Sequence, residues 1–156
     1  MATMQELKER LEELRDLYFR ATPEQRYRVA LSRLKTPARP STTLVDHVSA
    51  IEGFARSIVL DSERKNGTDV QAAYDRLRWV GGVPLLRDHL TVVLGKQPDE
   101  IFGADDWTLF LLAVDYRNLL VHEAATLREG YCIILTEACT RVLKSLADIS
   151  GVRGAG

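Results

Sequence analysis

The sequence reads Asp115-Tyr116-Arg117-Asn118-Leu119-Leu120-Val121-His122-Glu123 at the end of its most apolar predicted helix. This helix is apolar nearly all round from Trp107 to Val114, which is typical of a helix in the middle of a bundle. Packing alone would favour more leucine at its end, yet the sequence places Arg117, Asn118 and His122 there. We therefore take these three residues as the candidate catalytic site.

The spacing of the three residues makes a geometric prediction. Successive residues of an α-helix are rotated by about 100°, so Asn118 and His122 differ by roughly 40° and share a face. Arg117 and His122 differ by roughly 140° on a regular helix. One straight helix cannot aim both side chains at the same atom. Either the helix unwinds or bulges near Val121, or a second copy of the chain completes the site.

The three side chains suit the cleavage of RNA without a metal. Histidine has an ordinary pKa of ~6.5 and can move protons near neutral pH. Arginine is always charged and grips phosphate oxygens with two donors. Asparagine can orient the histidine or the substrate. His122, Arg117 and Asn118 supply one of each within six residues.

The pattern Arg117-Asn118, three residues, then His122 resembles the signature of the HEPN superfamily, which consists of small all-helical domains. Many of them are metal-independent ribonucleases. The resemblance covers the helical pattern from about Thr42 to Leu146 and implies a cleft between two protomers, in which the 2′-hydroxyl of RNA attacks the adjacent phosphate and leaves a cyclic phosphate end. It implies RNA and a homodimer as partners, no cofactor, and a toxin-antitoxin, stress or defence setting with a cognate antitoxin or regulatory protein.

Two other functions fit the same sequence. One is a non-catalytic HEPN-like module that binds a nucleotide, RNA or a partner protein. The other is a helical adaptor or regulator, in which recognition uses the basic second helix and a narrow apolar seam near the N-terminus, formed by Leu7, Leu11, Leu14 and Tyr18. That seam suits a partner helix, either in the same bundle or in a second protomer.

Hydrophobic periodicity predicts an all-α chain, because no alternating strand pattern bounded by hairpin turns occurs. We expect an N-terminal helical hairpin in residues 1–40 as an extension of the same domain, a HEPN-like bundle in 41–150 and a flexible tail in 151–156. The linker Thr36 to Ser41 contains two prolines. Further helices are expected from Thr43 to Lys65, from Thr68 to about Val80, from Pro84 to Leu94 and from Asp105 or Asp106 onwards. The last helix is expected along a core stripe formed by Leu127, Tyr131, Ile134, Leu135, Ala138, Val142, Leu146 and Ile149. The segment from Gly95 to Gly103 is expected to be a loop.

The helix that follows Thr22 and Pro23 is the most basic region of the chain. Its basic side chains could follow a phosphate backbone or could simply form a solvated face. The candidate RNA-binding residues are Arg26, Arg28, Arg33 and Lys35. On the next helix, Gly53 could let another helix approach closely, while Glu52 is expected to be exposed rather than turned towards the site.

Metal and thiol chemistry are not indicated. The three histidines, His47, His89 and His122, include no pair at metal-ligand spacing. Cys132 and Cys139 lie seven residues apart in a predicted helix, about 10 Å along its axis and beyond disulfide reach. We interpret them as small core residues.

Length, composition and net charge limit the classes of protein that fit the sequence. The 156 residues suffice for one globular domain. A net charge of -1 argues against a protein that coats nucleic acid through its overall charge, so a polyanion site would have to be local. No apolar run approaches the ~18 residues that cross a bilayer, and we expect a cytoplasmic protein that does not enter the membrane.

Overall fold

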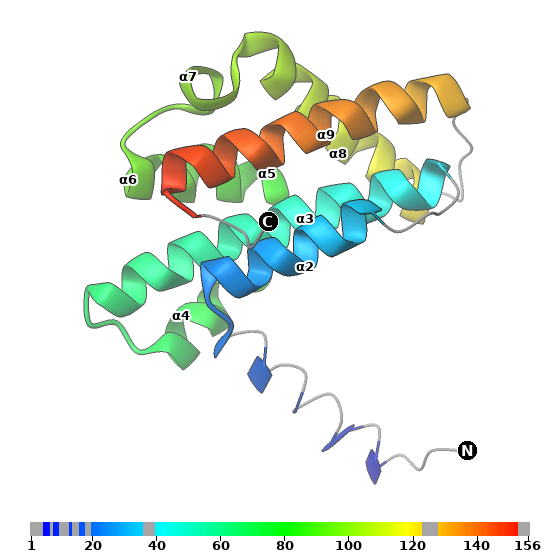
Figure 1. The fold of residues 1–156 in the computed structure, drawn as a ribbon. Helices are drawn as coiled ribbons and strands as arrows, with labels where there is room; N and C mark the ends of the chain where they lie inside the picture. The colour runs from blue at the N-terminus through cyan, green and yellow to red at the C-terminus, as the bar shows by residue number, and fades with distance from the viewer. Residues whose placement is uncertain are drawn as a thin grey trace.

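The computed structural model describes residues 20–35, 40–122 and 128–152, and before them residues 5, 6, 8, 9, 13, 16 and 17. Every element in this part of the chain is helical, with no strand among these residues, which confirms the all-α prediction. Figure 1 shows the arrangement. The elements are α2 (Pro23–Lys35), α3 (Pro40–Lys65), α4 (Val70–Leu77), α5 (Gly82–Pro84), the π-helix η1 (Leu85–His89), α6 (Leu90–Leu94), α7 (Pro98–Phe102), α8 (Ala104–His122) and α9 (Glu129–Ser150).

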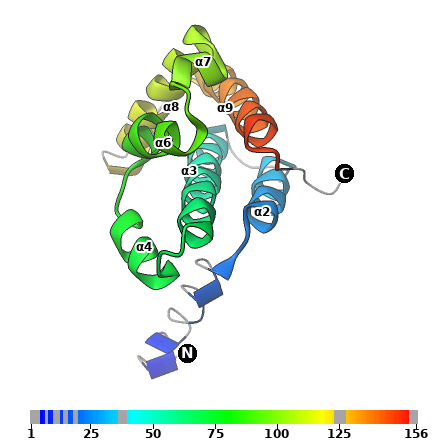
Figure 2. The same cartoon turned by 90° about the vertical axis from the view of Figure 1, so that its left-hand side faces the viewer.

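Helix α2 begins where its sequence predicts. The Gln25 amide donates to Oγ1 of Thr22 at 3.2 Å, and the Thr22 amide donates to Oε1 of Gln25 at 2.8 Å. This reciprocal pair satisfies donors that a first helical turn leaves open. Helix α2 lies along α3 (Figures 1 and 2), and the rings of Tyr27 and Phe54 are 5.3 Å apart. The predicted seam of Leu7, Leu11, Leu14 and Tyr18 lies outside the described residues.

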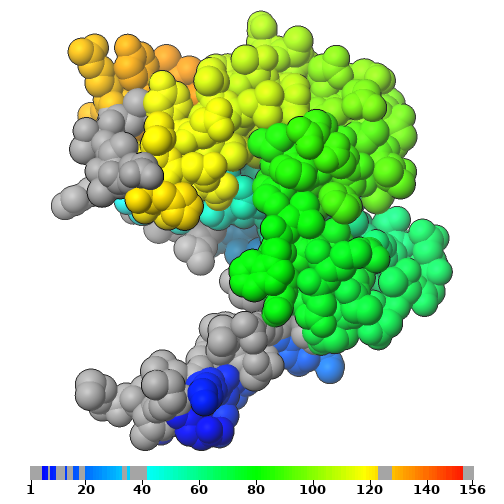
Figure 3. All heavy atoms as spheres, turned by 180° about the vertical axis from the view of Figure 1, so that it is seen from behind, coloured from blue at the N-terminus to red at the C-terminus, as the bar shows by residue number. Residues whose placement is uncertain are grey.

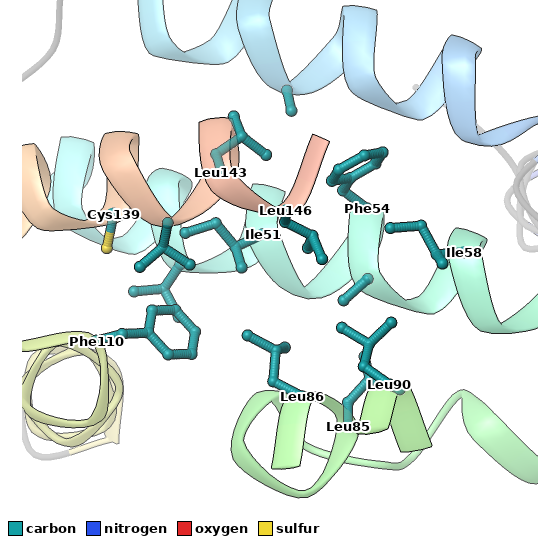
Figure 4. Packing of buried hydrophobic residues seen from close by; sticks show 14 of the residues in the cluster. Ile51, Phe54, Ile58, Leu85, Leu86, Leu90, Phe110, Cys139, Leu143 and Leu146 are labelled. Atoms are coloured by element: carbon teal, nitrogen blue, oxygen red, sulfur yellow. The ribbon is translucent and has the colours of Figure 1, made fainter. Parts of the chain in front are cut away.

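Helix α3 is the central element of the bundle. It contacts α2, α4, α8 and α9, and Figure 2 shows it between α2 on one side and the α4–α6 segment on the other. Its predicted apolar stripe is buried throughout: Leu44, Val48, Ile51, Ala55 and Ile58. Figure 4 shows how Phe54 and Ile51 of α3 meet Phe110 of α8 and the leucines of η1, α6 and α9 in one core. The helix starts at Pro40 rather than Thr43, because proline fits the first turn of a helix.

The chain from α3 to the start of α8 departs from the sequence-based prediction in three places. The predicted loop from Gly95 to Gly103 contains α7, which starts at Pro98 and buries Phe102. Five residues are too few to reveal a helical period in the sequence. The predicted helix from Pro84 to Leu94 is helical, but its middle turn is the π-helix η1. Helix α8 also starts one residue before Asp105, so both aspartates lie in its first turn.

Burial of His47 makes the stability of the fold depend on pH. The ring is 3% exposed, and its Nδ1 lies 2.8 Å from the Thr43 carbonyl oxygen. Burial lowers the pKa of His47, and the Thr43 carbonyl and Asp46 offset this only in part. The unfolded chain therefore takes up this proton at a higher pH than the folded chain.

We expect the free energy of unfolding to be largest above the ordinary histidine pKa of ~6.5 and to decrease as the pH falls through the lowered pKa of His47. Urea unfolding at pH 7.5, 6.5 and 5.5 measures the slope. The slope should be reduced in His47→Gln, which cannot titrate. An unchanged slope in that variant would assign the pH dependence to other groups.

Candidate functional site

Arg117 is turned inwards, towards α3. Its Nη2 donates to Oε1 of Glu52 at 2.9 Å, and its Nε donates to Oδ1 of Asn118 at 3.0 Å. The side chains of Arg117 and Glu52 are only 18% and 14% exposed. The expectation that Glu52 is exposed is therefore wrong, because α8 brings a cation to it from 65 residues away along the chain. A partly buried carboxylate needs such a partner.

The backbone around Glu52 is shaped to accommodate this side chain. A Cβ atom on Gly82, at the start of α5, would lie 2.5 Å from Oε1 and 2.7 Å from Cγ of Glu52. Only glycine lets the chain pass this close to the carboxylate. Arg56, one turn after Glu52, donates to the carbonyl oxygens of Leu77 and Val80 at 3.2 and 3.0 Å. The segment between α4 and α5 is thus held over α3 at two points.

His122 is the last residue of α8 and is exposed. Asn118, one turn earlier, is exposed as well, in line with the shared face that the spacing predicts. Helix α8 continues as a regular α-helix to His122, so the predicted alternative of an unwound or bulged turn near Val121 is not found. Arg117 faces α3 while His122 faces outwards, and a single chain does not bring the two side chains together.

The end of the bundle that carries His122 also exposes apolar side chains. Leu119 and Val121 of α8 are 47% and 53% exposed, and Tyr131 and Ile134 of α9 are each 51% exposed. The two helix ends lie at the same end of the molecule (Figure 1). The predicted core stripe of α9 is therefore correct only from Leu135 onwards, because Tyr131 and Ile134 lie on an exposed side of the helix, although Cys132 between them is buried. Leu127, the first residue of the predicted stripe, lies outside the described residues.

The predicted RNA-binding residues differ in burial and in their surroundings. Arg26 is half-buried and lines a cavity with Glu52 and Arg56, whereas Arg28 and Lys35 are exposed. The side chain of Arg33 lies outside the described part of the chain. Among the described side chains of this group, only Arg26 lies beside the Arg117–Glu52 pair.

Three residues next to Arg117 or Glu52 were not predicted as parts of the site: Glu52, Arg56 and Gly82. One signal for the first two was present, since Glu52 and Arg56 are two opposite charges one turn apart within a largely apolar helix. Such a pair can be a solvated surface pair just as well. Gly82 had no comparable signal, because Gly81-Gly82 reads equally well as the end of a helix.

Cys132 and Cys139 are buried free cysteines, as predicted. Burial raises the pKa of Cys139 to about 12, so this thiol is not ionised at neutral pH. Within the described ranges, no three His, Cys, Asp or Glu side chains come together in a way that could hold a metal ion. None of the described helices has the length and apolar character needed to span a membrane.

Comparison of the chain with models of known protein families, with curated proteins and with solved structures gives no match.

Proposed function

We propose that this protein is a metal-independent endoribonuclease of the HEPN type that works as a homodimer. The observation that carries the proposal is that Arg117 is fixed by Glu52 and Asn118 just over one turn before an exposed histidine at the end of α8. A cation held rigidly by hydrogen bonds stabilises developing phosphate charge without reorganising during the reaction. Histidine is the side chain best suited to proton transfer near neutral pH.

In the proposed reaction the 2′-hydroxyl oxygen attacks the adjacent phosphorus, and the bond from phosphorus to the 5′-oxygen breaks. The products are a 2′,3′-cyclic phosphate and a 5′-hydroxyl end. His122 transfers a proton to or from one of the two oxygens. Arg117 contributes N–H groups not used by Glu52 and Asn118, since a guanidinium carries five.

The directions of the Arg117 and His122 side chains support the homodimer as part of the proposal. Arg117 and His122 of one chain diverge, and apolar side chains next to His122 are exposed. Exposed apolar groups of this kind mark interaction sites. A two-fold interface on this face would place the ends of two α8 helices side by side, so that His122 of one protomer meets Arg117 of its partner. A toxin-antitoxin, stress or defence role with a cognate antitoxin or regulatory protein belongs to the same proposal.

One observation favours a second function, a non-catalytic module that binds RNA or a nucleotide. Glu52 offsets the charge of Arg117 in a partly buried pair, and such a pair can serve packing and orientation alone. An RNA cleavage assay distinguishes the two functions. The endoribonuclease, incubated with single-stranded RNA and a chelator, is expected to release fragments with cyclic phosphate ends, identified by mass spectrometry. RNA that is bound but left intact, or cleavage that requires an added divalent ion, would contradict the nuclease.

The exposed Trp79 gives a prediction about RNA binding. Its ring is 79% exposed, lies 5.0 Å from the guanidinium carbon of Arg78, and stands on the segment that Arg56 holds on both sides. Exposed aromatic rings stack on the bases of single strands, and each stacked base is worth about 1–3 kcal/mol. We expect Trp79→Ala to weaken the binding of a single-stranded oligonucleotide by that amount in a fluorescence anisotropy titration.

The matched control is Val92→Ala, which truncates another apolar side chain that is 84% exposed. This variant should bind RNA with the affinity of the wild-type protein. Equal affinities of Trp79→Ala and Val92→Ala would remove Trp79 from the RNA-binding surface.

A further inference from the structure

A cavity of about 290 Å³ lies between α2, α3 and α4, next to the Arg117–Glu52 pair. Arg26 of α2 and Arg56 of α3 reach it from different helices, and Ser49 and Tyr74 add hydroxyl groups to its lining. In the view from behind, the surface is recessed between the yellow end of α8 and the green segment of α4 and α5 (Figure 3). The residues that line the cavity therefore include two cations, the carboxylate of Glu52 and three residues with hydroxyl groups, Ser49, Ser57 and Tyr74.

The position of Arg26 depends on a glycine. A Cβ atom on Gly53 would lie 2.4 Å from Nη2 of Arg26, so the guanidinium rests directly on the backbone of α3. The close approach that Gly53 permits is thus made by an arginine side chain. Only a residue without a side chain leaves room for this contact.

Arg56 has donors left for a ligand. Its Nε and Nη2 donate to the carbonyl oxygens of Leu77 and Val80, and a guanidinium carries five N–H groups. Burial lowers the pKa of Arg56 and the positive charge of Arg26 lowers it further, while Glu52 and Tyr74 act in the opposite direction. An anion bound between Arg26 and Arg56 would interact favourably with both guanidinium groups.

Two further charged residues, Glu52 and Arg117, lie at or next to the cavity. Glu52 also lines the cavity, but its Oε1 accepts from Arg117. Arg26 and Arg56 line the cavity beside this carboxylate, and Arg117 binds the carboxylate from α8.

We propose that the cavity between α2, α3 and α4 is a binding site for a phosphate monoester, held by Arg26 and Arg56. A tetrahedral phosphate accepts hydrogen bonds from several directions, which suits two guanidinium groups on different helices better than a planar carboxylate would. The cavity volume lies at the lower end of the ~300–1,000 Å³ typical of small-molecule sites. It therefore has room for more than the phosphate itself, and Leu60 and the Tyr74 ring line it for the attached group.

The ligand is either a free nucleoside monophosphate or the phosphorylated end of an RNA strand. This inference goes beyond RNA cleavage and does not depend on it, because binding is measured without turnover. The test uses isothermal titration calorimetry of the full chain with inorganic phosphate, adenosine 5′-monophosphate and adenosine. The same titration of His122→Ala with short RNAs that carry a 5′-phosphate or a 5′-hydroxyl identifies the source of the phosphate.

We expect phosphate and the monophosphate to bind and adenosine not to bind. Arg26→Ala should weaken binding of the monophosphate by about tenfold or more, since a hydrogen bond to a charged group is typically worth at least ~1.5 kcal/mol. The matched control is Arg28→Ala on the same helix, whose side chain is exposed and outside the cavity. It should retain the wild-type affinity.

Gly53→Ala is the second variant. It keeps every charge, favours the helix by removing a glycine, and displaces only the end of the flexible Arg26 side chain. It should also weaken binding. Absence of binding of phosphate, monophosphate and 5′-phosphorylated RNA to the wild-type protein would overturn the proposal, as would Arg26→Ala and Gly53→Ala variants with the affinity of Arg28→Ala. Failure of the cleavage assay would leave this result unaffected.

Discussion

Replacing His122 with alanine is expected to reduce RNA cleavage by about 10²–10⁴-fold, the usual contribution of a general acid or base. The side chain is exposed at the end of α8, so the substitution should change the free energy of unfolding by less than ~0.5 kcal/mol. Initial rates on a labelled single-stranded RNA in the presence of a chelator give the activity, and thermal unfolding gives the stability. His89→Ala removes a histidine from another helix and serves as the control. Equal rates for His122→Ala and the wild-type protein would refute the nuclease mechanism.

A mixing experiment tests the second part of the mechanism, the site shared between two protomers. His122→Ala and Arg117→Ala should each be inactive alone. After subunit exchange, half of the dimers are mixed, and one of the two shared sites in each mixed dimer is intact. About a quarter of the wild-type activity should then return. No recovery in a mixture shown to contain mixed dimers would place Arg117 and His122 of each active site in one chain.

The second large effect is expected at Glu52. Removing one partner of a fully buried ion pair costs about 3–5 kcal/mol; because Glu52 and Arg117 remain 14% and 18% exposed, solvent reduces this cost to about 1–3 kcal/mol. Glu52→Ala should therefore lower the melting temperature by several degrees. It should also slow RNA cleavage, because Arg117 loses the acceptor that fixes its direction.

A double-mutant cycle separates the ion pair from other effects of the two substitutions. The free energies of unfolding of Glu52→Ala, Arg117→Ala and the double variant are measured by urea denaturation. If the pair is coupled, the double variant is less destabilised than the sum of the single variants by about 1 kcal/mol or more. Additivity to within ~0.5 kcal/mol would mean that the 2.9 Å contact contributes nothing to stability.

Local patterns predicted the helices well where the signal was strong. The long stripe of α3 and the capping of α2 by Thr22 and Gln25 follow from residues close together in sequence. The prediction failed for α7, which is too short to show a period, and for Tyr131 and Ile134. Those two side chains continue the apolar stripe of α9 in sequence, but each of them is 51% exposed in the structure.

In the candidate site, too, the positions of residues on one helix could be predicted from the sequence, whereas contacts between helices could not. Arg117, Asn118 and His122 lie on one helix, and the helical rotation of ~100° per residue fixes which of them share a face. The sequence by itself therefore determined the all-helical class, the position of the three residues and the divergence of Arg117 from His122. Only the tertiary structure decided that Arg117 is paired with Glu52, and that Arg26 and Arg56 converge on one cavity. Such contacts join residues far apart along the chain, and they depend on how α2, α3 and α8 pack rather than on any local pattern.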